Sequence, residues 1–259
     1  MGVDVPRLIA LLAEAGLDLV HAFDAHAVGE LARAEVLREE ADARTPVEPV
    51  LAKNRDGSTR MILPRTSRPL ARWTRLATGG RLGLLVGNTR ALWAPFVAAR
   101  GLPDANRLDT YVERQVDRAL QACGDREARD TVVYSHLRYD AAFLPFQQLA
   151  VTTGFAAQSD AGLAIHPVYG PWFALRAVIT IDPPSVLALL SSCAAPTPIA
   201  KPCVCSGACE TALATARADL RDWRAWLAVR DACSLREHRY SDEQIRFHYA
   251  SAWPKAARE

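Results

Sequence analysis

Three cysteines lie within seven positions of the segment KPCVCSGAC, at Cys203, Cys205 and Cys209. Thiolates at this spacing could bind a soft metal ion, Zn(II) or Cu(I), with Cys193 as a further ligand. They could instead supply a redox-active thiolate, or lie in a loop without chemical function. Because a C-x-C step is tighter than the usual zinc-knuckle spacing and the run lacks the intervals of a ferredoxin motif, we rank a redox thiolate above a metal site and expect no iron–sulfur cluster.

A second concentration of reactive and aromatic side chains lies in the segment IHPVYGPWFALRAVI. Around one turn it carries His166, Tyr169, Trp172, Phe173 and Arg176. One interpretation is a buried hairpin whose aromatic residues are core and whose arginine pairs with a carboxylate; the other is a ligand site. Buried polar groups usually have structural partners, so composition alone favours the hairpin. We interpret the remaining histidines, which are scattered along the chain, as structural or solvent-exposed.

The bulk composition excludes several classes of protein. The 259-residue chain is 50% hydrophobic and 23% charged, with a formal net charge of +2, as is typical of a folded globular protein. Charges of both signs are interspersed without a basic stripe, so we expect no nucleic-acid partner. The first apolar run contains Glu14 and Asp18, which argues against a signal peptide, and no run is long enough to span a membrane. We expect a cytoplasmic protein with reduced cysteines and no membrane association.

The elements that must position these residues follow from periodicity. Apolar residues at helical spacing on either side of LDLVHAF predict helix, strand and helix within residues 8–37, and residues 41–80 predict loops with one short hairpin near Asp56 and Gly57. The further predicted elements, in chain order, are a strand at 81–89, a helix at 91–101, a helix at 106–123, a strand at 130–137, a helix at 143–156 broken near Gly154, two strands within 161–182 joined by a tight turn at 168–171, one long helix at 210–233 and a helix from 241 with Ser241 as its cap.

Strands and helices alternate here without a strict βαβ rhythm. The pattern predicts an α+β fold with a mixed sheet flanked by helices. We expect a single domain over residues 1–259, with the cysteine-rich loop inserted at about 183–210. The glycines match neither GxGxxG nor GxxxxGK[ST], which removes the simplest nucleotide-binding interpretations.

The aromatic segment resembles a motif of the cobalamin-processing CblC family, His-Pro-aromatic-Gly-x-Trp-Phe-Ala-aliphatic-Arg. The run DWRAWLAVRDACSLREHRYSDEQIRFHY is similar to that family's C-terminal segment, sharing Arg-Asp-Ala at 230–232 and RYSDEQ at 239–244. Weaker similarity, in the family's order, lies in GLDLVHAFDAHAVGEL, LGLLVGNTRALWAPF, LDTYVERQV and FQQLAVTTGFAA. The chain thus looks like a divergent member, similar over most of its length outside roughly 41–78 and 183–208, with an added cysteine-rich loop.

This resemblance implies a flavin-reductase-like or nitroreductase-like α+β fold that binds cobalamin with its lower base detached and removes the upper axial ligand. In that family, cyanide leaves reductively with reduced FMN or FAD, and alkyl groups transfer to the thiolate of glutathione. The implied partners are a corrinoid small molecule and a downstream cobalamin-handling protein, with the chain a monomer or homodimer. Alternatives from other classes stay open: a non-catalytic corrinoid carrier or thiolate metal-binding protein on the same fold, and a flavin-dependent reductase of another substrate.

The resemblance also implies site residues, carried over position by position. Those expected to bind the corrinoid are Tyr134, Pro145, Phe146, Gln147, Gln148, Ala164, His166, Trp172 and Leu175. Tyr134 stands where the family has an acidic contact residue. A histidine that the family carries in the helix after this corrin-contact segment is Thr152 here, so any role of that imidazole is lost or moved.

The expected catalytic residues are two arginines and the loop cysteines. Arg176 and Arg230 match arginines that hold glutathione in the family, a role that suits a guanidinium because it grips carboxylates bidentately. Cys203, Cys205 and Cys209 would supply a thiolate whose pKa Arg176 lowers, or, in the alternative interpretation, would ligate Zn(II) or Cu(I).

Overall fold

The structure is a computed structural model of the chain. It describes the backbone at residues 3–26, 28, 50–53, 59–62, 82–103, 106–124, 132–136, 144, 146–159, 161–181, 208–219 and 222–250. Side chains are described at the same positions except in the two short strands at 50–53 and 59–62. Within these ranges, no helix combines the length and the hydropathy needed to cross a bilayer.

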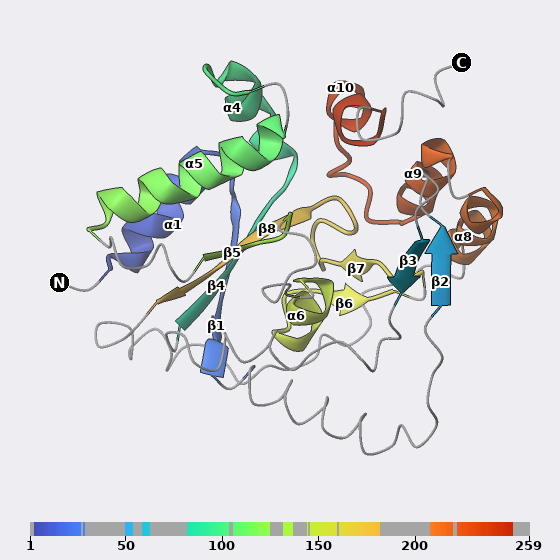
Figure 1. Cartoon of the computed structure of the whole chain (residues 1–259), viewed down its shortest axis with the longest axis horizontal. Coiled ribbons are helices and arrows are strands. Elements are labelled where there is room, and N and C mark those ends of the chain that lie inside the picture. Colours follow the sequence, from blue (N-terminus) through green and yellow to red (C-terminus); the bar gives the residue numbers. More distant parts are fainter. Residues whose placement is uncertain are drawn as a thin grey trace.

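The N-terminal part of the chain supplies two neighbouring strands of the main sheet, one at its edge and one at its centre, and the helices that cover one of its faces (Figure 1). Its elements are α1 (Val5–Glu14), β1 (Leu19–Asp24), the hairpin strands β2 (Val50–Lys53) and β3 (Thr59–Ile62), β4 (Leu82–Asn88), the 3₁₀ turn η2 (Arg90–Leu92), α4 (Trp93–Ala98) and α5 (Arg107–Ala122). Local chemistry sets the first boundary, because the Asp4 carboxylate accepts a hydrogen bond from the Arg7 amide at 3.1 Å and caps α1.

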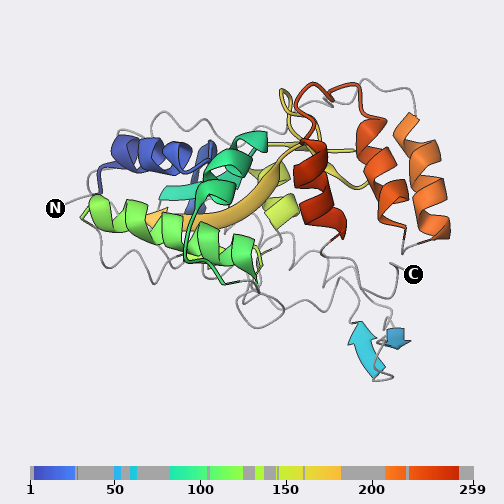
Figure 2. The ribbon, with the colours of Figure 1, turned by 90° about the horizontal axis from the view of Figure 1, so that it is seen from above.

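The C-terminal part closes the sheet and adds a group of helices. Its elements are β5 (Val132–Tyr134), α6 (Phe146–Thr152), β6 (Ala157–Gln158), β7 (Ala164–Ile165), β8 (Ala174–Ile181), α8 (Ala208–Ala218), α9 (Trp223–Asp231), α10 (Asp242–Ile245) and a π-helical turn η4 (Arg246–Ala250). Ser241 caps α10 by accepting a hydrogen bond from the Gln244 amide, as the sequence predicts. Both views show α8, α9 and α10 at the end of the molecule opposite α1 (Figure 2).

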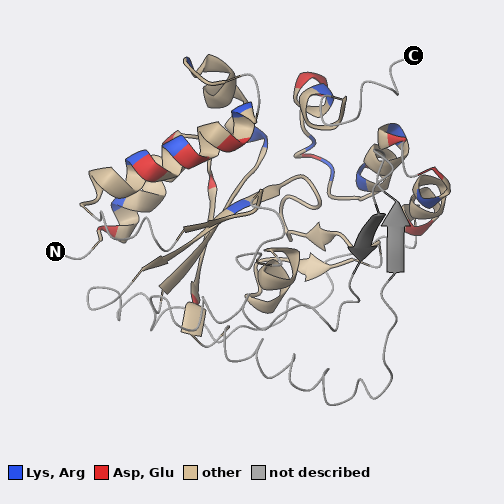
Figure 3. Cartoon of the chain, in the orientation of Figure 1, with Lys and Arg blue, Asp and Glu red and all other residues tan. Residues whose placement is uncertain are grey.

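The main sheet has the order β1-β4-β8-β5, and each of its pairings is antiparallel. The expected α+β class is confirmed, but the expectation of a mixed sheet is wrong for the described strands, because no parallel pair occurs among them. All seven residues of β4 are buried, and the strands of the sheet are almost free of charged residues (Figure 3). Burial on both faces explains why β4 reads as a continuous apolar run instead of an alternating one.

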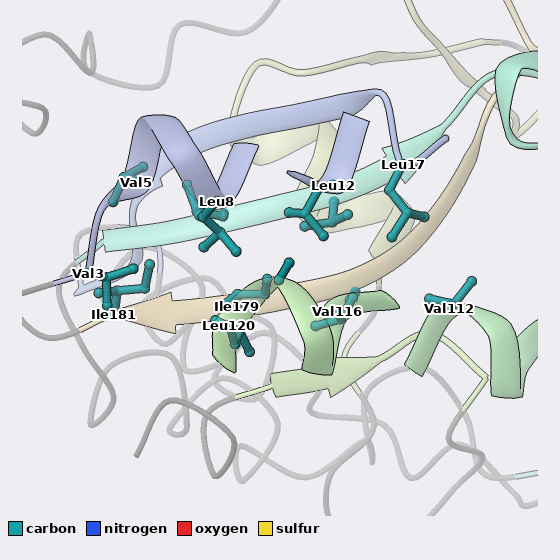
Figure 4. Packing of buried hydrophobic residues seen from close by; sticks show 14 of the residues in the cluster. Val3, Val5, Leu8, Leu12, Leu17, Val112, Val116, Leu120, Ile179 and Ile181 are labelled. Carbon is teal, nitrogen blue, oxygen red and sulfur yellow. The ribbon is translucent and has the colours of Figure 1, made fainter. Parts of the chain in front are cut away.

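Two apolar clusters cover the two faces of this sheet. On one face, side chains of α1 and α5 meet β4 and β8, with Leu8, Leu12, Val116, Leu120 and Ile179 at the centre (Figure 4). On the other face, the first turns of α6 and the segment after it pack on alternate residues of β1, β4 and β8. The sheet is therefore the middle layer of a helix–sheet–helix arrangement.

A β-bulge interrupts the pairing of the two central strands, β4 and β8, at the end of the sheet that faces the C-terminal helices. Val86 pairs with Ala177 and the next residue, Gly87, pairs with Leu175, so Arg176 is the extra residue on β8. A Cβ on Gly87 would lie 2.7 Å from the carbonyl oxygen of Ala174, so glycine permits this close approach. Bulges break the alternation of a strand and re-aim a side chain, and here the re-aimed side chain is the arginine.

Two expectations about connections are wrong. The strands on either side of residues 168–171 do not pair with each other, because β7 pairs with β6 and β8 pairs with β4 and β5. The turn between them is closed by a bridge between His166 and Gly170. The long helix expected at 210–233 is two helices, since Asp222 accepts a hydrogen bond from the Arg224 amide at 2.9 Å and starts a new helix. The helix expected after β1 lies mostly outside the described residues.

Gly170 provides a test of this turn. Its φ of +56° is left-handed, and a Cβ there would overlap the backbone carbonyl of Leu235, which packs directly against it. Gly162 has a φ of +75° with nothing near its missing Cβ, so Gly162→Ala should cost only the backbone strain, about 1–2 kcal/mol. We predict that Gly170→Ala destabilises the protein by clearly more than Gly162→Ala, measured as urea unfolding midpoints. Equal losses would show that the turn does not pack on Leu235.

Candidate functional site

The bulged Arg176 is held in place by an amide and not by a carboxylate. Its Nε donates to Oδ1 of the buried Asn88 at 2.6 Å, and Nδ2 of Asn88 donates to the Thr89 carbonyl at 2.7 Å. Thr89 in turn donates from its amide and its hydroxyl to the Asp18 carboxylate, at 2.8 and 2.6 Å. Burial lowers the pKa of the Arg176 guanidinium. Among the described residues, only Nε of Arg176 makes a hydrogen bond, and a guanidinium is a group that suits binding of a carboxylate.

Beside Arg176 lies a set of polar side chains that we call the C-terminal polar cluster: the buried Trp172, Tyr240 and Gln244 and the half-buried His248. The Trp172 and Tyr240 rings meet edge to face at 5.6 Å, and Tyr240 contacts the His248 ring at 5.7 Å. Within the described chain, Trp172 Nε1, the Tyr240 hydroxyl, both amide atoms of Gln244 and His248 Nε2 have no hydrogen-bond partner. Each such orphaned group costs about 1–3 kcal/mol. Orphans gathered in one place are typical of a site that a polar ligand or water completes.

The electrostatics of the C-terminal polar cluster favour a negative ligand. Burial raises the pKa of Tyr240 to about 12 and lowers that of His248 to about 4, so both are neutral near pH 7. The positive charges of Arg176 and Arg230 act on both groups, opposing the shift of Tyr240 and adding to that of His248. The two arginines that the resemblance pairs are thus brought to the same cluster from β8 and α9. Charged residues also gather on α8, α9 and α10 (Figure 3).

Arg230 reaches this cluster from the last turn of α9. Its guanidinium carbon lies 5.8 Å from the centroid of the Tyr249 ring, a cation–π contact that orients the side chain. Tyr249 belongs to η4, and Trp223 at the start of α9 stacks on the same ring at 6.1 Å. These aromatic contacts tie α9 to η4, so that Arg230 and His248 approach each other from different elements.

An apolar surface lies on the α6 side of the sheet. It brings together three of the residues expected to contact a corrin, Phe146 of α6, Ala164 of β7 and Leu175 of β8, in one cluster that also includes Phe155 and Phe173. The side chains of Ala164 and Leu175 are half-buried, so part of this surface is accessible.

His166 lies at the edge of this surface in a fixed tautomer. Its Nδ1 accepts hydrogen bonds from the backbone amides of Val168 and Tyr169, at 3.1 and 3.3 Å, which leaves the proton on Nε2. The ring contacts Phe155 at 4.9 Å and Tyr169 at 4.8 Å. Burial, with the charges of His21 and His238, lowers its pKa to about 4. His166 is therefore a neutral imidazole that can donate from Nε2.

Other expected site residues lie elsewhere. Gln147 and Gln148 occupy the exposed face of α6, and Trp172 lies in the C-terminal polar cluster and not on the apolar surface. Tyr134 packs on the opposite face of the sheet and stacks on His136, whose Nε2 is 2.8 Å from Glu113 Oε1. The structure therefore does not bring Tyr134 together with Phe146 and Leu175.

Of the loop cysteines, Cys203 and Cys205 lie outside the described residues, as do Cys193 and Pro145. Cys209 is buried in the first turn of α8, where it lines a small enclosed cavity with Cys233. Among the described residues, no group of three or more histidine, cysteine, aspartate or glutamate side chains is arranged to hold a metal ion. The described residues therefore do not test whether the three loop cysteines act together as a redox site or as a metal site.

Several residues of the candidate site were not singled out from the sequence. Asn88 is the last residue of the buried strand β4. A polar amide at the end of an apolar run is a sequence signal that could have identified it as a partner for another polar side chain. Tyr240 and Gln244 fall within RYSDEQ, which carried the resemblance but no assigned role. His248 was interpreted as structural or exposed, and nothing in its neighbours along the chain indicates that it meets two arginines.

The hydrogen bond between Asn88 and Arg176 can be measured by a double-mutant cycle. We predict that Asn88→Ala and Arg176→Met couple by about 1–3 kcal/mol in urea unfolding, because either single change leaves a buried group unpaired. The control is the pair Arg239 and Asp242, joined at 3.0 Å with Asp242 74% exposed, which should couple by less than about 1 kcal/mol. Equal coupling in both cycles would contradict the anchoring of Arg176.

The state of His166 predicts a pH dependence. Its folded pKa of about 4 lies below the unfolded value, so the unfolded chain binds more protons between roughly pH 6.5 and 4 and stability falls as pH falls through that range. His166→Asn keeps an acceptor for the two backbone amides but does not titrate. We predict a smaller loss of stability from pH 7 to pH 5 in this variant, measured by urea unfolding, with the exposed His26→Asn as control. An unchanged pH dependence in His166→Asn would refute the buried neutral imidazole.

Comparison with known proteins gives information about the fold. No protein-family model and no curated protein sequence matches the chain. Among solved structures, it is similar to that of a B12-trafficking protein CblC from C. elegans, described as a homologue of human MMACHC, with a TM-score of 0.54 and 14% sequence identity. The alignment covers 96% of this chain and 94% of the C. elegans protein. The chain therefore has a CblC-like fold over nearly its whole length.

Proposed function

We propose that this chain binds a corrinoid with its lower base detached and transfers an upper axial alkyl group from cobalt to a small thiol. The observation that carries the proposal is the convergence of Arg176 and Arg230 on buried polar groups without partners in the described chain. The likeness of the fold to a B12-trafficking protein supports the corrinoid as the substrate class. The same likeness extends over 96% of this chain, which supports a single domain.

The apolar surface near α6 suits one face of the corrin macrocycle. Phe146, Ala164 and Leu175 would pack against the ring, since large ligands bury most of their area on apolar side chains. His166 would not ligate cobalt in the tautomer that its hydrogen bonds favour, because Nδ1 accepts from two backbone amides and the proton is then on Nε2. Instead, Nε2 would donate to an amide carbonyl on the ring periphery. With Thr152 replacing the family's histidine, neither position offers the lower face of cobalt a nitrogen ligand.

The C-terminal polar cluster suits the thiol. Arg176 and Arg230 would bind the carboxylates of a tripeptide thiol such as glutathione, and their charge would favour its thiolate over the neutral thiol. Tyr240, Gln244 and His248 are neutral near pH 7 and offer donors and acceptors for the peptide groups. Binding would therefore satisfy the groups that the described chain leaves orphaned.

The reaction is a nucleophilic displacement at carbon. The thiolate attacks the alkyl carbon, a carbon–sulfur bond forms, and the cobalt–carbon bond breaks with both electrons left on cobalt. Co(III) is thereby reduced to Co(I), the alkyl group leaves as a thioether, and no outside reductant is needed. Loss of the lower base favours this step because four-coordinate Co(I) is the product. Reduced corrinoid is reactive, which favours transfer to a downstream cobalamin-handling protein.

We propose an external thiol in preference to the cysteine loop. Cys209 is only 6% exposed, and the cavity that it lines does not include Arg176 or Arg230. Flavin-dependent loss of cyanide is the other reaction that the resemblance implies. No contact in the described part of the chain identifies groups that would hold a flavin, so we derive no step through one.

The proposal is tested first by a visible-absorption titration with methylcobalamin and then by turnover with glutathione without oxygen. We predict a saturable shift marking loss of the lower base, followed by conversion to Co(I). Arg230→Gln should leave the shift unchanged and slow dealkylation by about 10–100-fold, because one charge-assisted bidentate contact contributes about 1.5–3 kcal/mol. Arg230→Lys should recover part of the rate.

Arg224→Gln is the matched control, since Arg224 lies on the same helix but is exposed, and its side chain contacts the Trp223 ring beside it. A shift without turnover would indicate a corrinoid carrier. If neither the spectral shift nor turnover is seen, the proposed function is refuted and only the likeness of the fold stands. Equal rates for wild type and Arg230→Gln would remove the arginines from the thiol site.

A further inference from the structure

A groove between α1 and α5 belongs to neither of the sites described above. Its volume is about 430 Å³, within the range of roughly 300–1,000 Å³ that is usual for small-molecule sites, and it is open to solvent on one side. The two helices run side by side, and α4 lies at one end of the groove, where the Phe96 ring contacts that of Tyr111 at 5.5 Å (Figure 1). Pro95 of α4 completes the wall at this end.

The floor of the groove is apolar. Leu11 and Ala15 contribute to it from α1, and Ala119 and Ala122 contribute from α5. Because an alanine side chain fills little space, these positions leave room between the helices for a ligand with aliphatic groups of its own.

Two exposed side chains of opposite charge also line the groove. Glu14 is the last residue of α1, and Arg118 lies in the second half of α5. Both are described, and no ion pair joins them. The Tyr111 hydroxyl donates to the Ala15 carbonyl at 2.9 Å, which places Glu14 near the Tyr111 end of the groove. Arg118 follows Tyr111 by seven residues, or about 10 Å along α5 at 1.5 Å per residue.

The groove is polar between and beside these charges. Its end near Glu14 also receives the partial negative charge of the carboxyl end of α1, so this end favours a cation. Burial raises the pKa of Tyr111, against the opposing charge of Arg118, so the phenol is neutral near pH 7 and its oxygen can accept a hydrogen bond. Gln115, midway between Tyr111 and Arg118, offers an amide donor and acceptor. One end therefore suits an ammonium, the middle suits peptide groups and the other end suits a carboxylate.

From this arrangement we propose that the groove binds an extended tripeptide with free termini and aliphatic side chains, its ammonium at Glu14 and its carboxylate at Arg118. Three extended residues span about 10–11 Å, which matches the spacing of the two charges. The aliphatic side chains would pack on Leu11 and the alanines of the floor, and the peptide groups would hydrogen-bond to Tyr111 and Gln115. The site does not depend on the proposed corrinoid chemistry, because α1 and α5 cover the face of the sheet opposite to α6.

The test is isothermal titration calorimetry of the full chain with tri-alanine and with its two capped forms. We expect saturable binding of tri-alanine. Acetylation of its amino terminus or amidation of its carboxyl terminus should each weaken binding by about 3–10-fold, the net contribution of about one hydrogen bond. Alanine and penta-alanine should also bind more weakly, because the first reaches only one of the two charges and the second is too long to place both termini.

Two variants assign the ends of the peptide. Arg118→Gln should weaken binding of tri-alanine by the same factor as amidation, and should then bind the free and the amidated peptide alike. Glu14→Gln should do the same for the free and the acetylated peptide. Arg7→Gln is the matched control, since Arg7 is an exposed residue of α1 that does not line the groove, and it should leave all affinities unchanged. Urea unfolding midpoints check that these substitutions at exposed positions preserve the fold.

The proposal is overturned if tri-alanine shows no saturable binding up to about 10 mM, or if neither cap weakens its binding. It is also overturned if the Arg118→Gln variant still prefers the free peptide over the amidated one, because the carboxylate then lies elsewhere. The titration contains no corrinoid and no thiol, so its failure is distinct from failure of the proposed alkyl transfer.

Discussion

The antiparallel pairing of β4 with β8 is the constraint on which the rest of the structure depends. This pair is buried on both faces, so its register decides which side chains meet α1 and α5 and which meet α6. The bulge opposite Gly87 adds one residue to β8, and that residue is Arg176. Without the extra residue, the arginine would have to fit the alternation of a sheet that is apolar on both sides. The same irregularity therefore satisfies the packing and supplies the functional group.

Burying polar groups next to that bulge lowers the stability of the folded protein, because these groups lose their hydrogen bonds to water. Asn88, Thr89 and Asp18 form a connected chain of hydrogen bonds that offsets part of the cost of placing a guanidinium there. The C-terminal polar cluster has no such compensation in the described chain. Buried polar groups without partners are typically completed by water or by a ligand, so under the proposed function the stability lost in the free protein would be linked to the affinity gained on binding. Under the proposed function, the apolar surface near α6 would contact the corrinoid, and the C-terminal polar cluster with its two arginines would contact the thiol.

The elements with strong local signals were predictable from the sequence. In α5, the apolar residues at helical spacing are buried, namely Leu108, Tyr111, Val112, Val116 and Leu120. The apolar run of β4 is a strand at the centre of the sheet. Pairing partners were not predictable, because periodicity identifies a strand but not its neighbour: β7 and β8 flank one turn yet belong to different sheets. Arg176 and Arg230 were identified through the resemblance. Their meeting with His248 depends on how η4 folds back on α9, which has no local signature in the sequence.

The central claim is that the chain binds a corrinoid whose cobalt has no lower nitrogen ligand. Electron paramagnetic resonance of cob(II)alamin, recorded with the protein in excess, tests it most directly. The account predicts loss of the nitrogen superhyperfine splitting of free cob(II)alamin, because the lower base is displaced and His166 keeps its proton on Nε2. A spectrum identical to that of free cob(II)alamin, or a bound form that retains nitrogen splitting from a protein imidazole, would contradict it.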